Sequence, residues 1–248
     1  MSDVFRKTGP AAALAMFEAE ADGLRELQSA NAIRVPQVLA CGVSNGESFI
    51  ELERFAFERS TTHTERRLGE QLATLHRHTE SRFGWYRDNT IGLTPQRNDW
   101  ADDWIEFFRT QRLGYQLELA TANGYGRDVA NLGARLTDRL PQFFADYVPV
   151  ASLLHGDLWS GNWGSVSGEP VIFDPAVYYG DRESDIAMTM LFGGFGKAFY
   201  AAYEASWPMA PGHEDRLKLY QLYHLLNHLN LFGRSYLGRT VGRMQELL

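Results

Sequence analysis

The sequence predicts an α+β fold with two lobes, a small N-terminal lobe and a larger, mainly helical C-terminal lobe. Residues 1–55 show a strand, a helix and two further strands, whereas helical periodicity dominates residues 56–248. A length of 248 residues suits one large domain or two closely packed lobes. We therefore expect the lobes to be residues 1–55 and residues 56–248.

Composition narrows the possible classes of protein. Hydrophobic residues make up 44% and charged residues 22%, as in ordinary globular proteins. The net charge of −7 argues against a general nucleic-acid binder, which would carry a basic stripe. No apolar run reaches the length of a membrane span, and the start lacks the apolar segment of a secretory signal. The single cysteine, Cys41, excludes an internal disulfide framework, so we expect a cytoplasmic protein with no membrane partner.

The small lobe is predicted from four segments. Residues 3–9 alternate and indicate an edge strand that ends at a Gly-Pro pair. Residues 11–30 place apolar side chains at helical spacing. Residues 35–43 and 48–55 indicate two strands joined by the turn "SNGE". We expect an antiparallel sheet with one helix.

The larger lobe begins with an amphipathic helix over residues 63–79. Residues 83–100 are rich in Gly, Asn, Pro and Asp, which predicts a loop long enough to have a functional role. Helices are expected over residues 100–120 and 128–147, and two or three more lie between the next motif and the end of the chain.

That motif is "LLHGDLWSGNWGSVSGEPVIFDPA", which predicts a β-hairpin preceded by an apolar strand. Asp157 can accept the proton of an attacking hydroxyl or orient it. Asn162 offers a neutral carbonyl oxygen for magnesium, and the hairpin brings Asp174 back beside it to bridge metal and phosphate. The dipeptides "GD", "GN" and "DP" of this motif are each, taken alone, typical of a turn or a strand end. Together with the five-residue step from Asp157 to Asn162 and the apolar strands on both sides, they favour a kinase.

Two further residues of this region are expected to be structural. His155 corresponds to a histidine that packs against the catalytic loop in the protein-kinase signature, so it is not expected to act as a base. Asp185 lies at the start of a predicted helix. It could cap that helix or act as a buried brace for the "HGD" loop, and we favour the brace.

Lys7 is the only lysine before Lys197, and it lies on the first predicted strand. A lysine there can reach the α- and β-phosphates of a nucleotide and be held by a helix glutamate. Glu20 precedes Leu24 by four positions, as such a glutamate typically precedes a core leucine, and Glu18 does not fit. The alternative is an ordinary surface lysine.

Other candidates are less specific. The backbone from Glu53 to Phe55 could bind an adenine edge as a hinge between lobes, or it could simply lead from a strand into a loop. Asn89, Gln96 and Asn98 are candidates for substrate contact. His224 and His228 lie one helical turn apart, a spacing that can bind a metal, but their segment is apolar and no third ligand is evident nearby, so we favour core histidines.

The sequence closely resembles the fructosamine kinase (ketosamine-3-kinase) family, relatives of the aminoglycoside and choline kinases in the protein-kinase-like superfamily. The similarity covers almost the whole chain, and "NTIGLTPQ" and "LYHLLNHLNLFG" are the segments most particular to the family. The resemblance implies a bilobal protein-kinase-like fold. It also implies phosphorylation of the 3-hydroxyl of free or protein-bound ketosamines (fructosamine or ribulosamine adducts) with ATP and Mg²⁺, and hence deglycation.

By position, the resemblance makes Asp157 the catalytic base, Asn162 and Asp174 the magnesium ligands, and Lys7 with Glu20 the phosphate-positioning pair. Family members also have two strands and a glycine-rich loop before this lysine. Nothing before Lys7 could form them, so we expect a sheet without its first two strands and a weakened hold on ATP. Alternatives are an aminoglycoside- or choline-type kinase, or an inactive kinase-like binding protein.

Overall fold

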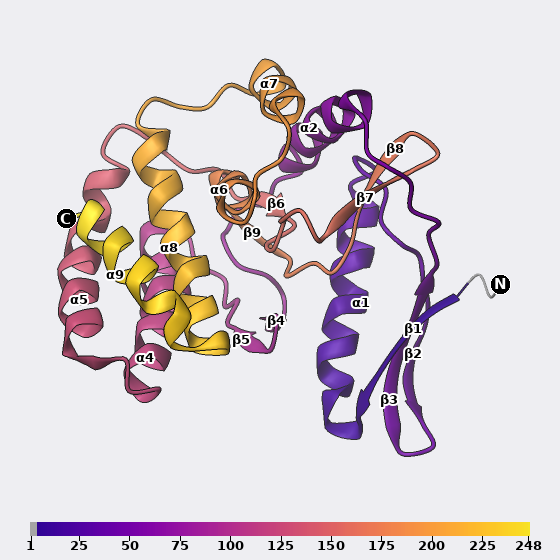
Figure 1. Cartoon of the computed structure of the whole chain (residues 1–248), viewed down its shortest axis with the longest axis horizontal. Coiled ribbons are helices and arrows are strands. Elements are labelled where there is room, and N and C mark those ends of the chain that lie inside the picture. The colour runs from indigo at the N-terminus through magenta and orange to yellow at the C-terminus, as the bar shows by residue number, and fades with distance from the viewer. Residues whose placement is uncertain (1–3) are drawn as a thin grey trace.

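The computed structural model describes residues 4–248, apart from the side chains of residues 127 and 128. The first residue of the expected N-terminal strand, Asp3, lies outside the described residues. A small sheet with one long helix forms one side of the molecule, and a helical assembly forms the other (Figure 1). The position of the boundary, expected at residue 55, stays a prediction.

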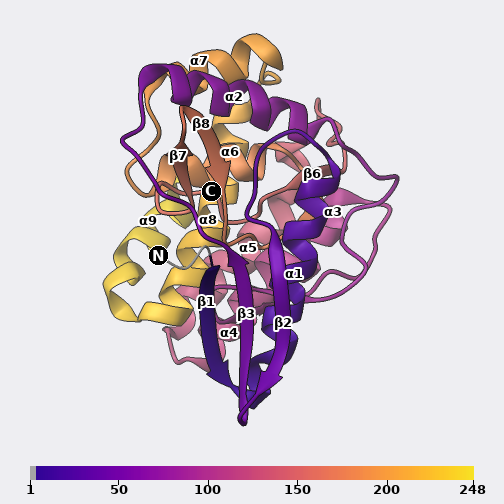
Figure 2. The ribbon, with the colours of Figure 1, turned by 90° about the vertical axis from the view of Figure 1, so that its right-hand side faces the viewer.

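The small sheet contains β1 (Val4–Pro10), β2 (Val38–Ser44) and β3 (Glu47–Glu53), all antiparallel, in the order β1-β3-β2. β2 and β3 are joined by Asn45 and Gly46, both with positive φ, which suits a two-residue hairpin turn. After a short 3₁₀ turn over Ala11–Ala13, helix α1 (Leu14–Ser29) packs across one face of the sheet (Figure 2).

The first helix of the larger part is α2 (Thr62–His76), which begins with a capping box between Thr61 and Thr64. It packs against α7 (Lys197–Ser206). The two helices approach closely at Gly69, where an added Cβ would lie 2.3 Å from the carbonyl oxygen of Phe199. A side chain at this position would therefore push the helices apart.

The segment predicted as a loop contains a short antiparallel hairpin, β4 (Asn89–Ile91) with β5 (Thr94–Gln96). The expected helix over residues 100–120 is instead divided. Helix α3 (Trp104–Phe107) passes into a π-helical segment, Phe108–Gly114, and then into α4 (Tyr115–Ala122). Strands of three residues are too short to show alternation, and a π-helical segment leaves no periodic signal in the sequence.

Two small sheets carry the motif region. β6 (Ser152–Leu154) pairs with β9 (Tyr178–Gly180), and β7 (Trp163–Val166) pairs with β8 (Glu169–Ile172). The predicted strand before "HGD" and the predicted hairpin after it are both present.

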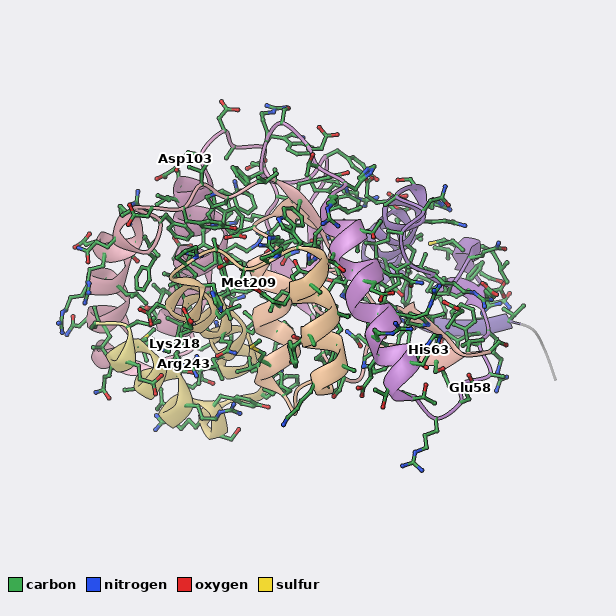
Figure 3. All side chains as sticks on the ribbon, turned by 90° about the horizontal axis from the view of Figure 1, so that it is seen from above. Glu58, His63, Asp103, Met209, Lys218 and Arg243 are labelled. Carbon is green, nitrogen blue, oxygen red and sulfur yellow. The ribbon has the colours of Figure 1, made fainter. Side chains whose placement is uncertain are left out.

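The remaining helices complete the larger part. They are α5 (Gly126–Phe143), α6 (Glu183–Leu191), α8 (His213–Phe232) and α9 (Leu237–Glu246). Seen from above, Lys218 and Arg243 mark the α8–α9 side, whereas Glu58 and His63 lie toward the small sheet (Figure 3). Within residues 4–248, no helix combines the length and apolar character needed to cross a membrane.

Candidate active site

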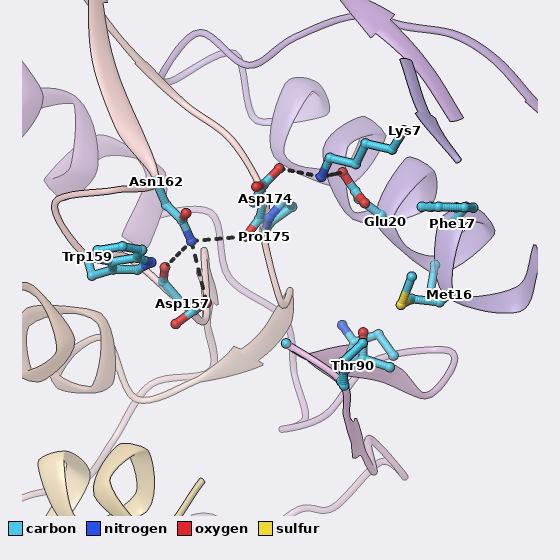
Figure 4. A pocket seen from close by; sticks show the side chains of 14 residues that line it. Lys7, Met16, Phe17, Glu20, Thr90, Asp157, Trp159, Asn162, Asp174 and Pro175 are labelled. Atoms are coloured by element: carbon cyan, nitrogen blue, oxygen red, sulfur yellow. Dashed lines mark hydrogen bonds and ion pairs between the residues drawn. The ribbon is translucent and has the colours of Figure 1, made fainter. Parts of the chain in front are cut away.

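A cavity of about 410 Å³ lies where α1, the β4–β5 hairpin and the "HGD" loop meet. Figure 4 shows side chains from all three regions facing this cavity. The sequence-predicted residues that line it are Lys7, Glu20, Asn89, Asp157, Asn162 and Asp174. The fold thus brings together residues from the small sheet and from the motif region.

The "HGD" loop turns sharply at Gly156, which has a φ of 83°. A Cβ at Gly156 would lie 2.0 Å from the carbonyl oxygen of Ala176, so only glycine fits there. Beyond the turn, the amide nitrogen Nδ2 of Asn162 donates to the backbone oxygen of Asp157 at 2.9 Å and lies 3.4 Å from Asp157 Oδ2. The same nitrogen lies 3.4 Å from the backbone oxygen of Asp174. These contacts hold the three residues around one point.

Asp185 holds the loop from behind. Its two carboxylate oxygens each accept a backbone hydrogen bond of 2.8 Å, from the N–H groups of His155 and Gly156. Although burial opposes it, hydrogen bonds from His76 and the loop lower the pKa of Asp185. Arg182 is the residue at the N-cap of α6, so Asp185 lies inside the first turn and acts on the loop rather than as the cap.

His155 is buried, and its Nε2 donates to the backbone oxygen of Phe173 at 2.9 Å. Burial lowers the pKa of its imidazole, which favours the neutral form. The ring ties the "HGD" loop to the residue before Asp174 and does not line the cavity. Its position is compatible with the structural role predicted for it.

Asp157 has an unusual proton affinity. Burial, followed by the negative charges of Asp185 and Asp174, raises its pKa to about 7, against a smaller opposing effect of the Asn162 hydrogen bond. A carboxylate with this pKa can gain or lose a proton near neutral pH. It is therefore suited to take a proton from a hydroxyl in the cavity.

Lys7 joins the two sides of the cavity. Its Nζ lies 2.7 Å from Glu20 Oε1 and 2.6 Å from Asp174 Oδ1. Burial lowers the pKa of Lys7, but the two carboxylates outweigh this effect and raise it, so the ammonium form is favoured. Glu18, in contrast, is exposed on α1 and makes no contact with Lys7 among the described interactions. The helix register thus presents Glu20 to the lysine.

A second cavity of about 300 Å³ lies beside the end of β3. Leu52, Glu53 and Phe55 line it, and so do Phe57 and Phe173, whose ring centroids are 5.3 Å apart. The Glu53 carboxylate forms an ion pair with Arg34 at 2.6 Å, so its side chain already has a partner within the protein. The backbone N–H of Glu53 donates to the backbone oxygen of Gln37. Asp174 lines both cavities, which makes them neighbours.

Several weaker candidates have other positions. Gln96 and Asn98 are buried and bond to other protein groups, so they do not offer the substrate contact expected from the sequence. His224 is buried, and its pKa falls to about 3, mainly because of burial.

Thr90 and Trp159, which the sequence patterns did not indicate as candidates, line the larger cavity. Their closeness in sequence to Asn89 and Asp157 was the available signal.

Metal binding would depend on few protein ligands. Among the described residues, no group of three or more His, Cys, Asp or Glu side chains is arranged to hold a metal ion. Asn162 and Asp174 supply an amide oxygen and a carboxylate at one cavity. Hard oxygen donors with an incomplete protein shell fit Mg²⁺ that is shared with phosphate oxygens. The residues present therefore fit magnesium.

A small antiparallel sheet with one helix, a larger helical part and, between them, a cavity lined by Lys7, Asp157 and Asp174 define the class of protein as protein-kinase-like. A family model described as fructosamine kinase matches residues 1–248. A probable ketoamine kinase of Synechocystis sp. is 48% identical over 248 residues, covering 98% of this chain and 82% of the relative. The chain belongs to the fructosamine kinase family.

Two other comparisons agree. A chloroplastic protein-ribulosamine 3-kinase of Oryza sativa subsp. japonica is 43% identical over 251 residues, covering 100% of this chain and 73% of the relative. A crystal structure of a protein assigned as a fructosamine-3-kinase from Haemophilus somnus superposes with a TM-score of 0.91 at 33% identity, covering 99% of this chain and 83% of the other. These comparisons confirm the protein-kinase-like fold predicted from the sequence, and the family is one of kinases.

Proposed function

We propose that this protein transfers the γ-phosphate of ATP to the 3-hydroxyl of a ketosamine, with magnesium as cofactor. The observation that carries the proposal is that one cavity contains both Asp157 and, opposite it, the Lys7–Glu20 pair, with Asp174 between them. One group that can accept a proton and one cation that can hold phosphates thus face the same space.

The two neighbouring cavities suggest how the nucleotide lies. The smaller cavity, with Phe57 and Phe173, suits a flat apolar base. Of the expected hinge from Glu53 to Phe55, the N–H of Glu53 is bound to the backbone oxygen of Gln37, so the backbone of Arg54 and Phe55 would offer the hydrogen-bonding groups at the edge of this cavity. The phosphates would then extend past Asp174 toward Lys7, whose ammonium would pair with them. Asn162 and Asp174 would hold Mg²⁺, which neutralises phosphate charge when bound.

Asp157 would act on the acceptor. The 3-oxygen of the ketosamine forms a bond to the γ-phosphorus while the bond from that phosphorus to the β,γ-bridging oxygen breaks, which releases ADP. The hydroxyl proton passes to Asp157, whose pKa of about 7 favours acceptance at neutral pH. Asn162 keeps Asp157 oriented through its amide nitrogen.

Ketosamines are proposed as acceptors because the matched relatives are named ketoamine kinase and protein-ribulosamine 3-kinase. The secondary amine of a ketosamine is protonated at neutral pH, and the carboxylates at the cavity favour a cation. Thr90, Leu93 and Trp159 also line the cavity and offer polar and apolar contacts for a sugar. In this role the protein would take part in deglycation.

The proposal is tested by measuring ADP release with ATP, Mg²⁺ and a ribulosamine adduct of lysine, and by locating the phosphate with NMR. The parent chain should phosphorylate the 3-hydroxyl, and Asp157→Asn should not. Asp215→Asn, which alters an exposed aspartate on α8, serves as the matched control and should behave as the parent does. Phosphorylation of an aminoglycoside such as kanamycin in preference to the adduct would overturn the ketosamine assignment.

A further inference from the structure

The β4–β5 hairpin is attached to the motif region by two buried side-chain amides. Nδ2 of Asn89 donates to the backbone oxygen of Val177 at 2.8 Å. Nε2 of Gln96 donates to the backbone oxygen of Ala176 at 3.0 Å and to Asn89 Oδ1 at 2.8 Å. We call Asn89 and Gln96 the amide clamp.

Every hydrogen-bonding atom of the Gln96 side chain is used. Its two N–H groups are engaged as described, and its Oε1 accepts a hydrogen bond of 2.8 Å from the hydroxyl of Tyr223 on α8. Asn98 Nδ2 also donates to Asn89 Oδ1, at 3.0 Å, and Arg112 donates to Asn98 Oδ1 at 2.7 Å. Because every polar atom of the buried Gln96 side chain is paired, a displacement of the hairpin would leave some of these groups without a partner, and the network therefore fixes the geometry.

The clamp connects two parts of the candidate active site. Beyond Asn89, the hairpin carries Thr90, Gly92 and Leu93, which line the larger cavity. Ala176 follows Asp174 by two positions, and its N–H donates to the backbone oxygen of His155 at 2.8 Å. The segment that contains Ala176 and Val177 is therefore bound to the hairpin on one side and to the "HGD" loop on the other.

The hairpin needs such an attachment. Its strands have three residues each, and an isolated hairpin of this size is not stable in water. Leu93 at its tip is 77% exposed, whereas Ile91 in β4 is buried in the hydrophobic core. The clamp adds directional hydrogen bonds to this apolar packing and thereby sets the distance of the cavity wall from Asp157 and Asp174.

We propose that Gln96 is a positioning residue for phosphate transfer. It holds the acceptor-side wall of the cavity at a set distance from the Asp174 segment and the "HGD" loop, and it touches neither substrate. The inference rests on the proposed function, and it names the part of the fold that aligns the acceptor hydroxyl with the phosphate. A displacement of about 1 Å in such an alignment can lower the rate about a hundredfold.

The test compares Gln96→Met with Gln221→Met. Gln221 is a half-buried glutamine on α8 that bonds to Ala187 O and Arg243, away from the hairpin, so the chemical change is matched. For Gln96→Met we expect kcat to fall and the acceptor KM to rise, with kcat/KM for the ketosamine reduced about tenfold to a hundredfold. The Kd of Mg-ADP should stay within about twofold of the parent value, and Gln221→Met should match the parent throughout.

Tyr223→Phe removes the bond to Oε1 of Gln96 but leaves both N–H bonds of Gln96 in place, so its kinetic defect should be smaller than that of Gln96→Met. Hydrogen exchange supplies a readout that does not depend on turnover. Gln96→Met should speed amide exchange in residues 89–96 and 174–178, and Gln221→Met should not. Equal kinetics in the two Met variants, or a loss of Mg-ADP affinity as large as the loss for acceptor, would overturn the positioning role.

Failure of the proposed function gives a different pattern. If the parent chain does not phosphorylate ketosamines, the assignment of the acceptor is wrong. The hydrogen-exchange experiment still tests whether Gln96 holds the hairpin against the Asp174 segment. Unchanged exchange in both segments of Gln96→Met would show that Gln96 does not hold them together.

Discussion

Lys7 Nζ lies 2.6 Å from Asp174 Oδ1, so an ion pair joins two residues separated by 167 positions in the sequence. The lysine comes from the small sheet and the aspartate from the motif region. Glu20 on α1 holds the same ammonium from the other side at 2.7 Å. The pair therefore ties the two parts of the protein together at the point where the phosphates of a nucleotide are proposed to bind.

Replacing Lys7 by Met should impair phosphate binding more than folding. Its ion pair with Asp174 is partly exposed, with side chains 25% and 46% accessible, and such pairs contribute about 1 kcal/mol or less to stability. Loss of the ammonium should reduce kcat/KM for ATP about a hundredfold, because a charge-assisted contact to phosphate is removed. Arg6→Met removes the neighbouring cation, which pairs with Glu51, and is the control. Equal ATP kinetics in the two variants would exclude a role of Lys7 in phosphate binding.

Asp157→Asn should lower activity and raise stability at alkaline pH. The pKa of Asp157 is about 7 in the folded state, against an ordinary value of 3.8. The folded state therefore binds more protons than the unfolded state between these values, and stability falls as the pH rises through 7.

The variant lacks this titration, so its free energy of unfolding without metal should exceed that of the parent at pH 8 by about 1 kcal/mol or more. The gain should shrink as the pH falls toward 4. At the same time kcat should drop about a hundredfold or more, because the proton acceptor is lost. Urea unfolding in EDTA at several pH values checks the first effect. A gain independent of pH would count against the raised pKa.

Asp185→Asn should destabilise the fold by about 2–4 kcal/mol. An asparagine amide can accept only one of the two N–H groups of His155 and Gly156, and its own NH₂ would face the other. The effect is measured by comparing the unfolding temperature of Asp185→Asn with that of Asp215→Asn, which replaces an exposed aspartate. The brace interpretation fails if the two variants unfold at the same temperature.

Asp174→Asn should raise the Mg²⁺ concentration needed for half-maximal activity about tenfold, because a neutral amide is a weaker ligand than a carboxylate. The substitution also alters the contact with Lys7. Glu20→Gln alters that contact from the other side without removing a proposed metal ligand, so it separates the two effects. A magnesium titration that shifts equally in both variants would argue against Asp174 as a ligand.

Local patterns predicted much of the fold. Alternation over residues 3–9 and helical spacing over residues 11–30 indicated β1 and α1, because side chains repeat every two residues along a strand and about every 3.6 residues along a helix, and α1 buries one face. The helical register also selected Glu20 over Glu18, and the structure places Glu20 against Lys7. The five-residue step from Asp157 to Asn162 could be recognised because both residues lie in one short loop.

The hairpin, the π-helical segment and the amide clamp could not be predicted in this way. The partner of Gln96 is a backbone carbonyl 80 positions later, and backbone carbonyls have no sequence signature. The π-helical segment carries Arg112, whose guanidinium reaches Asn98 in the same buried network. These features depend on which segments become neighbours after folding.

The sequence by itself determined the strands and helix of the small sheet, the hairpin of the motif region, the types of the reacting groups and the family, because these depend on local periodicity and on short motifs. The tertiary structure alone decided which amides are buried, how the β4–β5 hairpin is held and that the pKa of Asp157 lies near 7. Burial and the approach of distant charges set these properties, and both arise only when residues far apart in the chain come together.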